Sequence, residues 1–525
     1  MAQRTPRNPY HEEEFDREMR RTERPQNGRT YSSNNGRTYS GDSDIAAKRT
    51  ASSASRAARS RAGRPEYDPV RRSEYRECPN AGYRQSSSYN HRPPQKRRKK
   101  KKSHAGLIIL VIVLLLIAGG VVYLLQSGLL NKAEEVVAED TRPVPADPAV
   151  ASTAMVGATG DILLHTPILD AHTDWNGGYD FTYVFSNVAK IYQQADLMIA
   201  NLEITLGGEE YGEYTGYPVF NSPDEIVPAL KNAGIDLCLT ANNHTNDTGY
   251  SGMMRTLEVL DEYGIEHIGT RESSDEHFLQ LRNINGIRLG MLCYTYDTRE
   301  YTDGEMSLNG GILSDEAIDK VNTFSYEYLD EFYADIQQQV DYMDMLGTDI
   351  KMVFMHWGTE YMDYPNEYQT EIAQKLCDLG IDVIIGGHPH VIQEFDTLTS
   401  SVDGHETICL YSMGNELSNQ RADLMDEDGN RGYTEDGLVI QVTFEKFNNG
   451  KVKIQGVNIV PTWVELDGNG YQIIALDGTV DPYSWGAGDP YSAINSYNRT
   501  IGRIGDAYIA YRASKNQSSI VEYIE

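Results

Sequence analysis

The chain has 525 residues, with 47 Lys and Arg against 77 Asp and Glu, which gives a formal net charge of -30. The charge is unevenly distributed, because residues 1–104 hold 26 basic and 12 acidic residues (net +14) and the remainder carries -44. So acidic a surface repels a polyanion, which excludes nucleic-acid binding by the larger part. The length also exceeds the roughly 100–200 residues usual for one domain, so a single compact domain is not expected.

The N-terminal region predicts a membrane protein. Residues 1–104 are poor in Leu, Ile and Val, so they cannot bury enough apolar surface to offset the entropy lost on ordering. This predicts a disordered tail. Residues 105–125 carry no charge and match the roughly 20 apolar residues that span a bilayer. The basic run from Lys96 to Lys102 places the tail in the cytoplasm by the positive-inside rule. We therefore expect a single-pass type II protein of the cell membrane with an extracellular C-terminal part.

The extracellular part begins with an extended linker, predicted over residues 126–152 from its acidic residues and prolines. Strand-like and helix-like segments then alternate, which predicts a layered α/β domain over residues 153–465. The expected strands are Thr153–Thr159, Leu197–Ala200, Ile235–Ala241, Lys351–Met355 and Ile381–Ile385. The expected helices are Pro223–Ala233, Gly252–Tyr263, Ser314–Leu346 and Asn366–Leu379, followed by a hairpin of Gly437–Phe444 and Lys451–Val460. Residues 466–525 form a C-terminal extension in which the sequence pattern is too weak to predict helices or strands.

The extracellular cysteines favour buried free thiols over a disulfide framework. Each of them lies in an apolar run, no CxxC motif occurs, and four cysteines in such a long stretch are too few for a framework. They are Cys238, Cys293, Cys377 and Cys409.

Polar side chains gather at the C-terminal ends of the expected strands. Ligands of α/β sheets bind at that edge, so these residues are predicted to meet. Imidazole with carboxylate suits Zn, Mn or Fe better than Ca, and the number of groups exceeds one tetrahedral site, so two divalent ions are expected. The residues are Asp161, His165, Asn201, Glu203, Asn243, His244, His356, His388 and His390.

Four of these nine residues also have a structural alternative. The Asn pair that includes Asn243 can cap the following helix, and Glu203 can be a solvated loop carboxylate. His356 alone can be a hydrogen-bonded histidine at a strand end, and His165 in LLHTP is most simply a structural loop residue. The GGHPH motif is the stronger signal, because its glycines allow a sharp turn that presents two imidazoles to one side.

Six motifs carry a family resemblance: VGATGDILL, IANLEITL, LTANNHTNDTGYSGMMRTLEVLDEYGI, VFMHWGTEY, IIGGHPHVIQ and LYSMGNELS. With them the chain resembles the poly-γ-glutamate capsule biosynthesis protein family (CapA-like) over about residues 153–420. That family is related to the calcineurin-like metallophosphoesterases, which implies a four-layered α/β sandwich with a dinuclear metal centre.

The resemblance implies roles for individual residues. The metal shell would comprise Asp161, Glu203, Asn243, His356, His388 and His390. His244 would be the catalytic proton donor or would orient a phosphate, and Asn415 in YSMGN would complete the floor of the site. The chain departs from the wider superfamily at Leu163, where a histidine is usual, and Glu416 stands where the family usually has an aromatic residue.

Three functions follow from the topology and the motifs. The first is a surface factor in making or exporting an anionic capsule polymer, with a metal-dependent phosphoesterase-like site and capsule synthase subunits as partners. The second is a genuine metal-dependent hydrolase of phosphoesters or wall polymers, and the third is a non-catalytic scaffold of a membrane synthase complex. Because the domain itself is acidic, an anionic polymer would contact it only locally, where divalent cations offset the like charge.

Overall fold

The computed structural model describes residues 148–425, 432–517 and 523–524. The predicted cytoplasmic tail, the predicted span at 105–125 and residues 126–147 of the predicted linker lie outside these residues, and the last linker residues, from Val150, belong to the first strand. Within the described ranges, no helix is both long enough and apolar enough to cross a membrane.

The first sheet contains the strand that opens the domain. Its order is β17-β16-β15-β1-β2-β3-β4, and β14 pairs with β1 off this path. The strands are β1 Val150–Ile162, β2 Leu197–Leu202, β3 Leu237–Leu239, β4 Glu266–Ile268, β14 Asn415–Leu417, β15 Asp436–Phe447, β16 Val452–Asp467 and β17 Gly470–Ala475. Because β1, β2 and β3 run parallel, their C-terminal ends share one edge.

The second sheet has the order β12-β13-β11-β10-β6-β5, with β9 beside β6. Its strands are β5 Gln280–Ile284, β6 Ile287–Tyr296, β9 Thr323–Phe324, β10 Ile350–His356, β11 Val383–Gly387, β12 Phe395–Thr399 and β13 Glu406–Leu410. Here β10 runs parallel to both β6 and β11, so the ends of β10 and β11 also align. A separate hairpin pairs β7 Ser307–Leu308 with β8 Gly311–Ile312.

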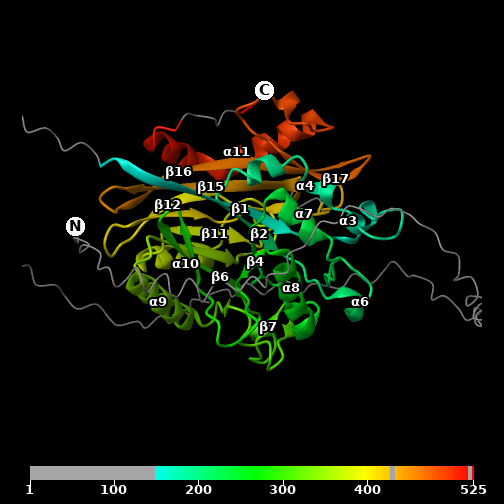
Figure 1. The fold of residues 1–525 in the computed structure, drawn as a ribbon, viewed down its shortest axis with the longest axis horizontal. Helices are drawn as coiled ribbons and strands as arrows, with labels where there is room; N and C mark the ends of the chain where they lie inside the picture. Colours follow the sequence, from blue (N-terminus) through cyan, green and yellow to red (C-terminus); the bar gives the residue numbers. More distant parts are fainter. Residues whose placement is uncertain (1–147, 426–431, 518–522, 525) are drawn as a thin grey trace, which may run out of the picture. The chain divides into compact units, whose positions relative to one another are not determined.

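Most of the helices lie on the outer faces of the two sheets, whereas α11 packs against the core between them. They are α3 Thr166–Ala171, α4 Thr182–Phe185, α5 Ala189–Tyr192, α6 Gly208–Tyr211, α7 Ile226–Ala233, α8 Gly249–Tyr263, α9 Leu329–Leu346, α10 Glu367–Asp378 and α11 Pro490–Ser514, with 3₁₀ turns η1 Arg299–Tyr301, η2 Tyr433–Glu435 and η3 Pro482–Ser484. In Figure 1, α9 and α10 lie on the second sheet, and α11 lies beside β16.

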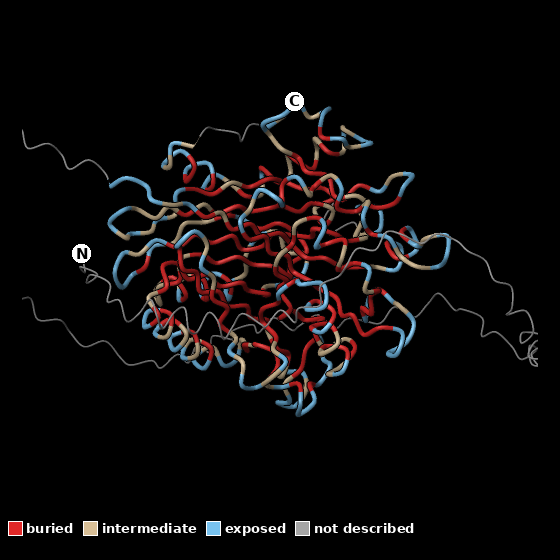
Figure 2. Tube along the Cα trace, in the orientation of Figure 1, coloured by how far each residue is buried: buried red, intermediate tan, exposed pale blue. Residues whose placement is uncertain are grey.

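Alternation along single strands shows how the layers stack. In β10, Met352 and Phe354 join the core between the sheets, whereas Val353 and Met355 face the core under α9 and α10. A third core lies between the first sheet and α3, α4, α5, α7 and α8. Buried residues accordingly fill the centre of the domain, and exposed residues concentrate in loops and outer helix faces (Figure 2). The described residues thus form four α/β layers, which confirms the predicted α/β class.

One predicted helix is wrong in its first half. The helix expected over Ser314–Leu346 begins only at Leu329. The preceding residues are held by long-range contacts, since β9 pairs with β6 and Val321 forms a bridge with Thr270. Ala317 and Val321 are buried in the core between the sheets, so tertiary pairing outweighs local helix propensity there.

The domain also extends past its predicted end at residue 465, which falls inside β16. The next strand, β17, pairs with β16, and α11 contacts strands of both sheets. Asp436 of β15 anchors α11 because its Oδ2 accepts a hydrogen bond from Arg499 Nε at 2.7 Å. The four cysteines of this domain are free and buried, as predicted.

Candidate metal centre

The predicted polar residues meet where the strand ends of the two sheets converge. Asp161 lies in β1 and Glu203 directly follows β2, whereas His356 ends β10 and the pair His388 and His390 follows β11. Each of these five residues is at most 4% exposed. Five ionisable side chains are therefore removed from water in one place, although they come from two different sheets.

These side chains form two overlapping groups of candidate ligands. One group is Glu203, His356 and His388, and the other is Asp161, Glu203 and His390. Within each group, the candidate ligand atoms all lie within 4.8 Å of one another. Glu203 belongs to both groups, so its carboxylate would be available to an ion held by either of them.

Asn243 joins the first group through its side-chain oxygen. Asn243 Oδ1 lies 2.9 Å from His356 Nε2, and that same ring nitrogen lies 3.5 Å from Glu203 Oε1. The other end of the amide is used elsewhere, since Asn243 Nδ2 donates to Asn309 Oδ1 at 3.0 Å. The amide oxygen therefore faces the same space as the imidazole and the carboxylate.

Two buried atoms of this cluster have no hydrogen-bond partner among the described residues: Glu203 Oε1 and His388 Nδ1. Leaving a buried polar atom unsatisfied costs about 1–3 kcal/mol. Burial, followed by the charge of Asp161, raises the pKa of Glu203 well above its usual range. Burial also lowers the pKa of His388 well below its usual range and that of His356 to about 3. Because imidazoles must be neutral to bind a metal, orphaned atoms and suppressed ring protonation both fit divalent ions.

The pair Asp161 and His390 behaves differently from the rest of the cluster. Burial alone would raise the pKa of Asp161, but the adjacent His390 and His356 hold it below its ordinary value. Burial alone would lower the pKa of His390, yet Asp161 raises it above its ordinary value. His390 Nδ1 also lies 3.1 Å from Asn415 Oδ1, which places Asn415 at the edge of the cluster.

The GGHPH turn explains how both of its imidazoles reach the site. A Cβ on Gly386 would overlap a backbone carbonyl oxygen, and one on Gly387 would lie 2.8 Å from Asp161 Oδ1. His388 and His390 have φ values of 97° and 58°, in a region that residues with a side chain rarely adopt. Such backbone strain, held by the surrounding structure, is typical of functional sites.

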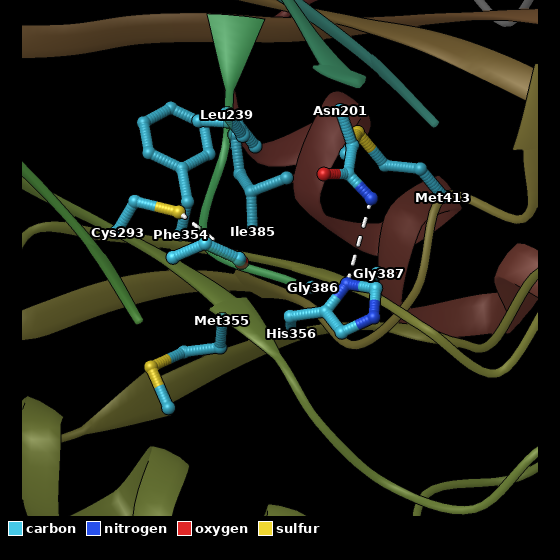
Figure 3. A pocket seen from close by; sticks show the side chains of 11 residues that line it. Asn201, Leu239, Cys293, Phe354, Met355, His356, Ile385, Gly386, Gly387 and Met413 are labelled. Carbon is cyan, nitrogen blue, oxygen red and sulfur yellow. Dashed lines mark hydrogen bonds between the residues drawn. The ribbon is translucent and has the colours of Figure 1, made fainter. Parts of the chain in front are cut away.

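Asn201 supports the cluster from β2. Its Nδ2 donates to Asp161 Oδ1 at 2.7 Å and lies 3.4 Å from His356 Nδ1. Figure 3 shows Asn201 and His356 facing each other beside apolar side chains that include Leu239 and Ile385. The pocket next to the cluster is therefore largely apolar, which strengthens electrostatic interactions within the cluster.

His244 lies beside the cluster and in neither ligand group. Its Nδ1 is 2.8 Å from Asp247 Oδ2, which also accepts a hydrogen bond from Phe220 N at 2.7 Å. The Phe220 ring meets the His244 ring edge-on, with the centroids 4.8 Å apart. One nitrogen of His244 is thus engaged by a carboxylate, which orients the other.

The remaining sequence features lie outside both ligand groups. His165 Nδ1 accepts a hydrogen bond from Asn419 N at 3.3 Å, and burial lowers its pKa to about 4. Leu163 packs in the core between the first sheet and its helices. Glu416 accepts hydrogen bonds from Tyr192 and Thr462 in the interior. Asn309 was missed by sequence reasoning, because an Asn-Gly pair indicates only a turn.

A known protein family matches the part of the chain that carries these residues. The family described as "Bacterial capsule synthesis protein PGA_cap" matches residues 155–420, which is just over half of the chain and includes every candidate site residue. The chain belongs to this family. The six sequence motifs thus correctly indicated that this chain belongs to the PGA_cap family.

Individual relatives are distant. The chain is 28% identical to the capsule biosynthesis protein CapA of Bacillus anthracis, over 46% of this chain and 55% of that protein. It is 23% identical to the PGA biosynthesis protein CapA of Bacillus subtilis, over 58% of this chain and 73% of that protein. A probable polyglutamine synthesis accessory protein of Mycobacterium tuberculosis is 25% identical, over 47% and 63%. The chain thus spans about half the length of the Bacillus anthracis relative.

Among solved structures, the NAD nucleotidase of Haemophilus influenzae is similar at a TM-score of 0.38 and 14% identity. The match covers 70% of this chain and 60% of that one. A likeness at this level carries no argument about the fold or the activity.

Proposed function

We propose that this protein is a membrane-anchored surface factor in the synthesis or export of an anionic capsule polymer, and that its outer domain holds a two-ion, phosphoesterase-like centre. Membership of the PGA_cap family and the printed names of the relatives support the polymer role. The observation that carries the metal centre is the buried carboxylate of Glu203, which belongs to both ligand groups and has an oxygen without a hydrogen-bond partner.

The residues that would hold the ions follow from the two groups. Glu203, His356, His388 and Asn243 would hold one ion, and Asp161, Glu203 and His390 would hold the other. Paired divalent ions of this kind act as Lewis acids toward phosphoryl-type oxygens and supply a water-derived nucleophile near neutral pH. Mn, Zn and Fe all suit this mixed donor set.

A histidine of the chain would transfer the proton in such a reaction. Asp247 engages Nδ1 of His244, so Nε2 is the atom that remains to exchange a proton with a bound group. A hydrogen-bonded carboxylate also fixes the ring orientation and its tautomer. This dyad favours the second candidate function, a genuine hydrolase of phosphoesters or wall polymers.

Membrane anchoring is part of the proposal and rests on the apolar residues 105–125 and the basic run before them. With the N-terminus inside, the metal-bearing domain would face the cell exterior. Protease added to intact cells should then remove the C-terminal domain and leave the N-terminal tail protected. Protection of both ends would contradict this topology.

The deciding measurement is the metal content of the full-length protein, purified in detergent, against His390→Ala. We expect two equivalents of a transition metal in the wild type and a reduced content in the variant, since His390 belongs to one ligand group only. A wild type without metal after growth in metal-supplemented medium would refute the centre. Deletion of the gene, with surface polymer measured on whole cells, tests the polymer role separately, and unchanged polymer would refute it.

Turnover separates the first two functions. A true hydrolase should cleave a generic phosphodiester with Mn or Zn, and His356→Ala should abolish this activity. Stoichiometric metal without turnover would favour a polymer-handling factor whose site binds rather than hydrolyses.

A further inference from the structure

The β7–β8 hairpin, which lies outside both principal sheets, contacts the candidate metal site through its tip. The tip is the pair Asn309-Gly310, with φ values of 48° and 73°. Asn and Gly are the residues that favour two successive positive φ values in a two-residue hairpin turn. The carbonyl oxygen of the Asn309 side chain accepts the hydrogen bond from Asn243 Nδ2 at 3.0 Å.

Several contacts hold this hairpin in place. Leu308, in β7, and Leu313, directly after β8, are buried in the core between the sheets. Gly310 N donates to Thr298 Oγ1 at 3.1 Å, and Asn246 Nδ2 donates to Gly311 O at 3.3 Å. The hairpin is therefore fixed both to the core and to the loop that carries Asn243.

The contact matters because the two ends of an amide differ. Only the oxygen of Asn243 can bind a metal, whereas its NH₂ group can only donate. The bond to Asn309 commits the NH₂ group, and Asn243 Oδ1 consequently faces His356 Nε2 at 2.9 Å. Without an acceptor at position 309, the amide would lose a contact that selects this orientation.

From this geometry we propose that Asn309 is a positioning residue that sets the orientation of the Asn243 amide and thereby the affinity of one of the two metal positions. The affected position is the one surrounded by Glu203, His356 and His388. The position formed by Asp161, Glu203 and His390 does not include Asn243. This inference rests on the metal centre proposed above.

Residues that orient metal ligands typically contribute 10–100-fold to metal affinity. Asn309 is exposed, whereas Asn243 is buried, so water can replace part of the lost contact. We therefore expect the lower end of that range, about 10-fold.

The test is titration of the metal-free full-length protein with Mn²⁺ by calorimetry. Asn309→Ala should weaken one of two binding steps by about 10-fold and leave the other unchanged. Asn309→Asp should retain wild-type affinity or exceed it, because it keeps an acceptor oxygen and tolerates positive φ. Asn285→Ala is the matched control, since Asn285-Gly286 is a second turn of the same type, at φ 53° and 80°, between β5 and β6.

The outcomes are distinguishable. A wild type that binds no Mn²⁺ refutes the metal centre and this inference with it. A wild type with two steps, and an Asn309→Ala variant that binds like the Asn285→Ala control, refutes the role of Asn309 alone. Equal weakening of both steps, or failure of Asn309→Asp to restore binding, would mean that the hairpin only stabilises the fold.

Discussion

Replacing Glu203 by Gln should remove most of the metal-dependent stability of the domain and leave its metal-free stability nearly intact. In the metal-free protein, burial and then the charge of Asp161 raise the pKa of Glu203 well above its usual range, which favours the neutral acid. Gln is neutral and of the same shape, so little changes when no ion is present. With ions present, the substitution removes the only carboxylate common to both ligand groups.

The size of the effect follows from ligand linkage. An ion at 100 times its dissociation constant stabilises the folded state by about 2.7 kcal/mol, so two ions contribute about 5 kcal/mol. Loss of a direct ligand should cost at least the roughly 100-fold upper end of what supporting residues contribute. Each ion would then add about 0.4 kcal/mol at the same concentration, and the metal-dependent increment would fall to about 1 kcal/mol.

The assay is denaturant unfolding with Mn²⁺ or with a chelator. Glu416→Gln is a matched control, because Glu416 is equally buried, has a pKa raised by burial to about 7, and lies outside both ligand groups. It should keep the full metal-dependent increment. An increment in Glu203→Gln as large as in the wild type would refute the role of Glu203 as a ligand common to both groups.

Three further predictions concern pH, the GGHPH turn and α11. The folded-state pKa of Glu416 lies above its unfolded value, so its stabilising contribution is present at low pH and is lost as pH rises through about 7. Between pH 4.5 and 8, the free energy of unfolding of Glu416→Gln should therefore rise by about 3 kcal/mol relative to the wild type. A difference that does not change with pH would contradict this. Gly386→Ala should destabilise the protein by about 2 kcal/mol or more in thermal unfolding, since the new methyl group overlaps backbone, whereas Gly468→Ala, in open space, should be near neutral. Arg499→Met should lower the free energy of unfolding in urea by about 3–5 kcal/mol, because it leaves the buried Asp436 without its charged partner. A cost below about 1 kcal/mol would show that this ion pair does not hold α11 in place.

The sequence located the side chains that the structure brings together, because their placement follows a local rule. Asp161, His356 and His388 each end or follow a run of apolar residues, and parallel strands bring their C-terminal ends to one edge. The same rule could not show that β1 and β10 belong to different sheets, since strand order depends on pairing between residues far apart in the chain.

Local propensity predicts the wrong structure where contacts between residues far apart in the chain determine the fold. The segment before Leu329 has a helical pattern but is drawn into bridges with β6 and with Thr270. Residues after 465 show a weak pattern, yet they form β17 and α11, because tyrosines such as Tyr497 and Tyr508 pack on the core between the sheets.

By itself, the sequence determined the α/β class, the ends of the main strands and the identity of the polar residues at those ends, because hydrophobic periodicity and turn residues are local properties. Only the tertiary structure decided that Glu203 is shared by two ligand groups and that Asn309 holds the amide of Asn243. Both depend on side chains from separate strands meeting in a buried space. Their distances there are fixed by the packing of two sheets against each other, which no local pattern encodes.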